Sequence, residues 1–140
     1  MNFWECIYCL FTGTDPTEYQ QRKQTQQQIS QANPISPDPN IFTYRTRDGS
    51  SYFQFSYHKI TERKYEIDIH LFPPFNGRSQ NIHTIHVLHS RRSAQHKICI
   101  HSGKEPKTLK EAKELSKMYA ELINTYIKTG KTPDQQIAQQ

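Results

Sequence analysis

The histidines are the residues of this chain whose type and spacing could do the most chemistry. Seven are present, and all of them lie between residues 41 and 106. Alternation of polar and apolar residues, as in strands, places several of them on one face with an acid and a thiol: His58, His70, His86, His101, Asp68 and Cys99. Imidazoles and a carboxylate on one sheet face could bind a divalent metal or transfer protons. His58, His70, Asp68 and His101 are therefore a candidate metal or acid–base set; the alternative is an ordinary polar, solvent-facing surface.

A second histidine pattern is a spacing of three residues. His83, His86 and His89 would lie on neighbouring turns of a helix and could then share a metal ion. The surrounding residues favour a strand, in which His86 faces away from the other two. We therefore expect no metal site at this triplet.

Two cysteines near the start of the chain, Cys6 and Cys9, have the spacing of a zinc or redox pair. A structural zinc site needs four ligands, and the sequence has no second pair of this kind to complete it. The alternative is that residues 1–11 form a short apolar segment that docks on a protein partner. Its anchoring side chains would be Phe3, Trp4, Ile7, Tyr8 and Phe11.

The positive charges offer a third kind of chemistry, which is the binding of phosphate groups. The chain has a net charge of +5 at pH 7, and residues 41–106 carry ten Lys and Arg against five acids. Arg91 and Arg92 fall in an expected loop, where neighbouring guanidinium groups could contact successive phosphates. A nucleic-acid surface built on this pattern would use Arg45, Arg47, Arg78, Arg91, Arg92 and Lys97.

Composition divides the chain that has to position these groups. Seven Gln between residues 20 and 31 are followed by Pro34, Pro37 and Pro39, a composition that cannot bury enough apolar area to fold alone. We assign an apolar docking segment to residues 1–11, a Gln/Pro-rich linker to 12–40, an α+β domain to 41–130 and a polar tail to 131–140. The tail is expected to lack regular structure.

A period of two residues dominates the first part of the α+β domain and predicts strands. Asp48-Gly49 is typical of a tight hairpin turn, and Pro73-Pro74 ends a strand. Short spacings between strands favour antiparallel pairing, because parallel pairs need long crossovers. We therefore expect a four- to five-stranded antiparallel meander, with strands near Ile41–Arg47, Ser51–Ile60, Lys64–Phe72, Asn81–Ser90 and Lys97–His101.

One helix is expected after the strands, near residues 108–128. Thr108 and Glu111 have the spacing of a capping box, and Gly130 stands where a left-handed C-terminal cap belongs. An apolar stripe along this helix would pack on one face of the sheet, because neither surface is stable alone. The expected core contains Phe53, Phe55, Ile67, Ile69, Leu71, Ile85, Val87, Ile98, Ile100, Leu115, Tyr119 and Leu122.

These observations favour a protein that is not an enzyme. The sequence has no glycine-rich phosphate loop, nucleophile elbow or complete metal-ligand set, and no cofactor is expected. We expect a small adaptor or accessory subunit that docks on a protein partner through its N-terminal segment and its sheet surface. The alternative is a nucleic-acid-binding protein that uses the basic sheet face and the Arg91–Arg92 loop. No apolar run is long enough to span a membrane, and the absence of a secretory signal predicts a cytoplasmic protein.

Overall fold

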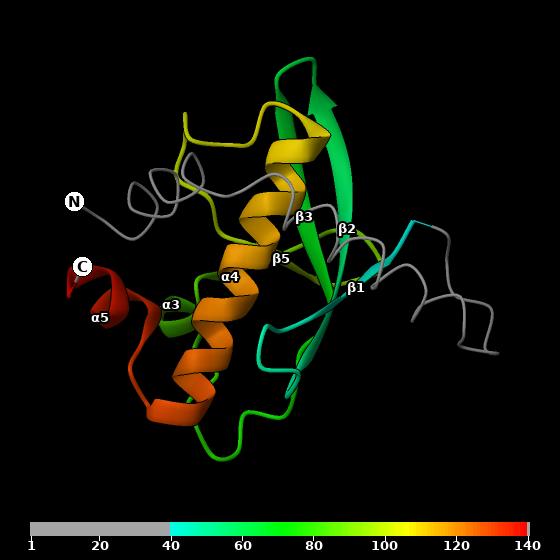
Figure 1. The fold of residues 1–140 in the computed structure, drawn as a ribbon. Helices are drawn as coiled ribbons and strands as arrows, with labels where there is room; N and C mark the ends of the chain where they lie inside the picture. Colours follow the sequence, from blue (N-terminus) through cyan, green and yellow to red (C-terminus); the bar gives the residue numbers. More distant parts are fainter. Residues whose placement is uncertain (1–39, 140) are drawn as a thin grey trace, which may run out of the picture.

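The expected α+β architecture, a five-stranded antiparallel sheet with a C-terminal helix across one face, is confirmed (Figure 1). The computed structural model of the protein describes residues 40–139, so the predicted N-terminal arm and its docking side chains lie outside the described residues. The elements are β1 (Phe42–Arg45), β2 (Tyr52–Thr61), β3 (Lys64–Leu71), α3 (Ile82–Ile85), β4 (Val87–His89), β5 (His96–Ile98), α4 (Leu109–Thr129) and α5 (Pro133–Ala138).

The sheet has the strand order β1-β2-β3-β5-β4, and every neighbouring pair is antiparallel. The end of the sheet therefore differs from the expected meander, since β5 lies between β3 and β4. The long connection after β3 contains Pro73-Pro74 and α3, and it carries the chain past the position next to β3 before β4 begins. β5 then returns through a hairpin to fill that position, where Asp68 is opposite Lys97.

The predicted fourth strand is wrong in its first half, where the chain forms the helical turn α3. The side chain of Asn81 accepts a hydrogen bond from the backbone N–H of His83 and so caps this turn. His86 ends the turn with a positive φ of 54°, and only three residues of β4 follow. A local cap thus overrides the strand-like pattern, and the three histidines of this segment share neither a helix face nor a strand.

Helix α4 agrees with its prediction. The Thr108 side chain accepts from the backbone N–H of Glu111, and Gly130 takes the left-handed conformation, with φ of 80°, as its N–H donates to the Tyr126 carbonyl. Most of the expected core is buried between α4 and the sheet. Leu71 is the exception, because it is 44% exposed at the end of β3, and Ile100 is only partly buried. Ile123 and Tyr126, which belong to the apolar stripe of the helix, are buried as well. The pattern missed several buried side chains: Tyr44, Phe75, Ile127 and Ile137.

The C-terminal tail is ordered, contrary to the expectation from its polar composition. Thr132 and Gln135 form a capping box that starts α5, and Ile137 is buried. This short helix lies beside α3 (Figure 1), and Asp134 contacts His86. Two buried residues, Pro133 and Ile137, and the capping box thus hold the segment against the domain.

The β1–β2 turn is tied to the C-terminal half of α4 by a polar cluster around Asp48. Its carboxylate accepts hydrogen bonds from Lys128 Nζ and, at 3.0 Å, from Asn124 Nδ2. The bond from Lys128, with others from Ser50, holds the pKa of Asp48 well below its usual range. Ser51 Oγ donates to Asn124 Oδ1 at 2.8 Å. The hairpin turn and the helix end are therefore one unit.

Candidate functional site

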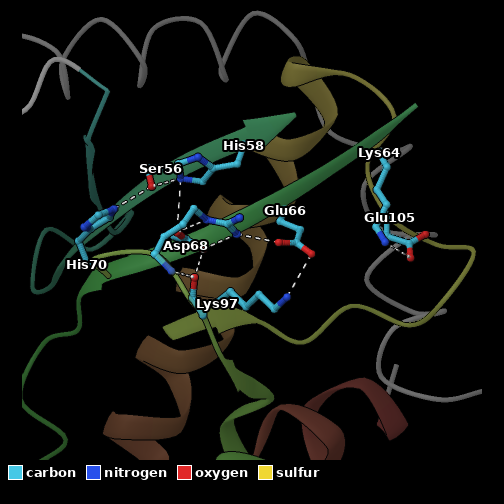
Figure 2. A network of polar contacts seen from close by, with 10 residues as sticks. Ser56, His58, Lys64, Glu66, Asp68, His70, Lys97 and Glu105 are labelled. Carbon is cyan, nitrogen blue, oxygen red and sulfur yellow. Dashed lines mark hydrogen bonds and ion pairs between the residues drawn. The ribbon is translucent and has the colours of Figure 1, made fainter. Parts of the chain in front are cut away.

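The polar face of β2 and β3, opposite α4, gathers the most concentrated set of chemically active side chains in the described residues (Figure 2). Alternation along β2 places Ser56 and His58 on this face, and β3 contributes Glu66, Asp68 and His70. Ser56 stands opposite Asp68 in the ladder, and His58 stands opposite Glu66. The register therefore brings imidazole, hydroxyl and carboxylate groups from both strands together on this face.

Ser56 connects the two histidines. Its Oγ lies 2.8 Å from His58 Nε2 and 2.7 Å from His70 Nε2, and Figure 2 shows the hydroxyl between the two rings. The residue is only 3% exposed, so these contacts satisfy a buried hydroxyl. Because a hydroxyl has one proton, it donates to one ring and accepts from the other, which requires different tautomers or charges at the two histidines.

His58 also faces a carboxylate, with its Nε2 3.3 Å from Asp68 Oδ2. Partial burial lowers the pKa of His58, and the positive charge of Arg92 and the neighbouring His70 act in the same direction, against the attraction of Asp68 and Glu66. A Ser-His-Asp relay uses one imidazole nitrogen for the serine and the other for the acid. Here the same nitrogen faces both groups, so this geometry is not that of a nucleophilic triad.

Asp68 is the centre of the network and is fully buried. Arg92 holds it with two bonds, from Nε to Oδ2 at 2.7 Å and from Nη2 to Oδ1 at 3.0 Å, and Ser90 Oγ donates to Oδ1 at 3.1 Å. A two-point contact of this kind is the strongest way for a guanidinium to neutralise a buried carboxylate. The Asp68 charge is therefore fully compensated inside the protein.

Glu66 extends the network towards β5. It accepts from Arg92 Nη2 at 2.7 Å and from Lys97 Nζ at 3.1 Å. Partial burial acts to raise the pKa of Glu66, but the hydrogen bonds from Arg92 and Lys97 outweigh it and lower that pKa. Hydrogen bonding to Asp68 raises the pKa of Arg92. Two cations and two acids thus form a balanced cluster.

The loop between β4 and β5 delivers Arg92 to this cluster. Ser90 N donates to the Gln95 carbonyl at 2.8 Å, Gln95 N donates to the Arg92 carbonyl at 3.0 Å, and Gln95 has a positive φ of 67°. Arg92 N also donates to Ser90 Oγ at 3.2 Å. This tightly wound loop covers the polar face, so the sequence-based expectation of an open Arg91–Arg92 loop holds only for Arg91, which is exposed.

A cavity of about 500 Å³ opens beside the network. Polar side chains from β2, β3 and the β4–β5 loop form one wall, and apolar side chains near the start of α4 form the other. Its lining comprises Asn40, Phe42, Ser56, Tyr57, His58, Lys59, Asp68, His70, Arg92, Ser93 and Leu109. The volume is within the usual range for sites that accept a ligand or a partner's side chain.

The same region contains an open sheet edge. β1 pairs only with Tyr52–Phe55, and no strand of residues 40–139 pairs with the outer edge of Ser56–Thr61. Among residues 40–139, this part of β2 therefore has no strand partner on its outer side, beside the cavity.

The proposed metal set is only partly brought together. His58, His70 and Asp68 share the network, but His101 lies elsewhere and its Nδ1 contacts the carbonyl of Ser102 at 2.9 Å. Arg92 and Ser90 already use the oxygens of Asp68. In the part of the chain that the structure describes, no group of three or more His, Cys, Asp or Glu could hold a metal ion.

Other sequence-based candidates are dispersed. His86 lies next to Asp134, with Nε2 2.9 Å from Oδ1, and burial lowers its pKa more than Asp134 raises it. Cys99 is partly buried against the core, and this burial raises the pKa of its thiol. The cysteine pair Cys6 and Cys9 and the docking side chains Phe3, Trp4, Ile7, Tyr8 and Phe11 all lie outside the described residues.

The six cations predicted for nucleic acid have different environments. Arg92 and Lys97 are ion-paired with the network acids, and Arg78 Nε donates to the Ile127 carbonyl at 3.2 Å near the end of α4. Arg45 lies over the ring of Tyr52 and donates to the Gly49 carbonyl, but it is exposed, as are Arg47, Arg78 and Arg91. Sequence spacing alone could not predict which cations are ion-paired and which are exposed, because the acids that bind Arg92 are more than twenty residues away.

None of the helices in residues 40–139 combines the length and apolarity needed to cross a bilayer. Comparison with protein-family models, with curated proteins and with solved structures gives no match to this chain.

Proposed function

We propose that this protein is a non-catalytic adaptor that binds an extended segment of a protein partner along the outer edge of β2. The observation that carries the proposal is the outer edge of Ser56–Thr61, with which no strand of residues 40–139 pairs. This edge belongs to a ten-residue strand whose neighbour β1 has only four residues. Unpaired N–H and C=O groups in such a row are a template for an added strand. The cavity beside them offers space for the side chains of that strand.

Two features of the surroundings support strand addition over other modes of binding. The edge is bordered by exposed apolar side chains, Ile60 on β2 and Leu109 at the start of α4, which an added segment could cover. The polar network behind the edge is internally paired and fixes β2 and β3 in place. A rigid, preformed edge lowers the entropy lost on binding. The N-terminal side chains Phe3, Trp4, Ile7, Tyr8 and Phe11 would add a second contact with the same partner.

Nucleic-acid binding is the alternative function. It depends on exposed cations, and four members of the predicted set are exposed: Arg45, Arg47, Arg78 and Arg91. Arg92 and Lys97, however, are bound to Glu66 and Asp68 and would have to leave buried or half-buried acids to contact phosphates. That cost favours the adaptor.

A selection of random peptides displayed on phage, with the full-length protein as bait, tests the adaptor. Synthetic versions of a selected peptide would be N-methylated at alternate amides, because only every second amide of an added strand faces the edge. We expect one methylated series to lose binding and the other to keep it. Equal binding by both series, or no selected peptide, would contradict strand addition. Retention on heparin that falls steeply with salt and is lost in Arg47→Ala/Arg91→Ala would instead support nucleic acid.

A further inference from the structure

We infer that the partner strand carries an acidic side chain, Asp or Glu, that enters the cavity beside His58. This inference rests on the proposed function, because it concerns the residue that faces His58 across the edge of β2. Directly opposed residues of two paired strands point to the same side of the sheet. A residue opposite His58 therefore points to the polar face, into the space lined by His58, His70 and Ser93.

Hydrogen-bond donors in this space have capacity to spare. Arg92 uses Nε and Nη2 on Asp68 and Glu66, and its Nη1 makes no hydrogen bond within residues 40–139. Lys59 Nζ lies 3.5 Å from Glu62, whose side chain is 92% exposed, so this ion pair is weak. Imidazole N–H groups and the hydroxyl of Ser93 add donors to the wall. Among side chains, a carboxylate can accept the most hydrogen bonds from these donors.

The charge balance permits an additional negative charge. The acids nearest the cavity, Glu66 and Asp68, are already neutralised by Arg92 and Lys97. Residues 40–139 carry 16 Lys and Arg against 9 Asp and Glu, a net charge of +7. An incoming carboxylate therefore meets no uncompensated acid at the site and is attracted by the domain as a whole. A cationic side chain at the same position would be repelled by the positive charge of Arg92, which lines the cavity.

The side chains on the α4 side of the sheet predict which residues flank the acidic residue in the partner strand. Residues on either side of it would point towards Tyr57 and Phe42, near the exposed Leu109 at the start of α4. Lys113 already lies over the Phe42 ring, 4.0 Å from its centroid, so this side is bordered by an aromatic surface. The expected pattern is an acidic residue between two apolar or aromatic residues.

Binding should strengthen as the pH falls. His58 faces Ser56 on its own strand, Glu66, Asp68 and His70 on β3, and Arg92 from the β4–β5 loop. Burial among these groups lowers the pKa of His58 and keeps its ring neutral at pH 7 in the free protein. A bound carboxylate stabilises the protonated ring, so binding takes up protons and is favoured at pH 6 over pH 8.

The decisive experiment compares three synthetic forms of an edge-binding peptide, with Glu, Gln or Lys at the position opposite His58, by fluorescence anisotropy on the full-length protein. We expect the Gln form to bind about tenfold more weakly than the Glu form, and the Lys form more weakly still. His58→Gln should remove most of the preference for Glu over Gln. The control His89→Ala, an exposed histidine on β4, should leave it unchanged.

The outcomes separate this inference from the function on which it rests. If edge-binding peptides lack an acidic residue, or if the Glu and Gln forms bind equally, the acidic site is wrong while strand addition stands. If both N-methylated series bind equally, strand addition and the acidic site fail together. Should His58→Gln unfold the protein, the binding of the Glu and Gln peptides to the unmodified chain at pH 6 and pH 8 decides instead. Only an acidic site predicts that the preference for Glu over Gln grows as the pH falls.

Discussion

The two faces of the sheet are built from the same strands but are held by different forces. On the α4 face, Phe53, Phe55, Ile67 and Ile69 are fully buried and contact apolar neighbours. On the opposite face, the residues between them form a network in which Arg92 binds two acids. Apolar burial is non-directional, whereas each contact of the network needs a particular atom at a particular distance. One face thus supplies most of the stability, and the other supplies a fixed arrangement of polar atoms.

The largest effect should come from the α4 face. Phe53→Ala removes a fully buried ring that packs on Phe55, with ring centroids 5.9 Å apart. We expect the free energy of unfolding to fall by about 3–5 kcal/mol, nearly independent of salt, in urea denaturation followed by circular dichroism. Leu71→Ala is the matched control, because Leu71 is exposed, and it should cost less than about 1 kcal/mol. Similar losses for the two variants would show that this face is not the main source of stability.

An intermediate effect should come from the network. Arg92→Ala leaves the buried carboxylate of Asp68 without its main partner, and because the Arg92 side chain is 32% exposed we expect a loss of about 2–3 kcal/mol, below the usual range for a buried pair. The neighbouring variant Arg91→Ala should change the free energy of unfolding by less than about 0.5 kcal/mol, since Arg91 is exposed. Chemical denaturation of both variants is the measurement. Equal effects would mean that Arg92 does not hold Asp68.

The smallest effect should be a pH dependence to which His58 on the network face contributes, together with His86 beside α5, whose pKa is also lowered by burial. The folded-state pKa of His58 is lowered by burial, so the unfolded chain binds its proton more readily. The free energy of unfolding should therefore fall as the pH drops through about 6.5, the value for an unperturbed histidine, and level off below the folded-state pKa. Denaturation midpoints at pH 7.5 and pH 5.5 measure this change. A His58→Gln variant with the same pH dependence as the unmodified protein would refute the assignment to His58.

The apolar face was largely predictable from the sequence. Every second residue of a strand points to the same face of the sheet. The apolar residues of β2 and β3 recur with this period, which identifies a buried face that contains Phe53, Phe55, Ile67 and Ile69. The cap at Thr108 is equally local, since it depends on residues three apart. The pattern fails where a short-range interaction competes with it, as at Asn81, whose side chain starts a helical turn in a segment that alternates like a strand.

The network was predictable only in part. Alternation places His58, His70 and Asp68 on one face, but it does not say which of them touch. The partner of Asp68 comes from a loop formed after β4, and its position depends on β5 lying between β3 and β4. A buried acid in the middle strand would indicate that some cation must reach it, but it does not indicate which of the adjacent residues Arg91 and Arg92 does so.

The polar contacts between the β1–β2 turn and α4 also affect when the chain can complete its fold during synthesis. Asp48 and Lys128 are joined across 80 positions of sequence, so the hairpin cannot complete its polar contacts until the end of α4 has been made. At ribosomal rates of about 5–20 residues per second, roughly 3–14 s separate the last residue of β2 from the last residue of α4. Throughout that interval the aromatic side of the nascent hairpin has no helix to cover it. We therefore expect these distant contacts to limit folding, and the chain to be most exposed to aggregation and to chaperones before α4 emerges.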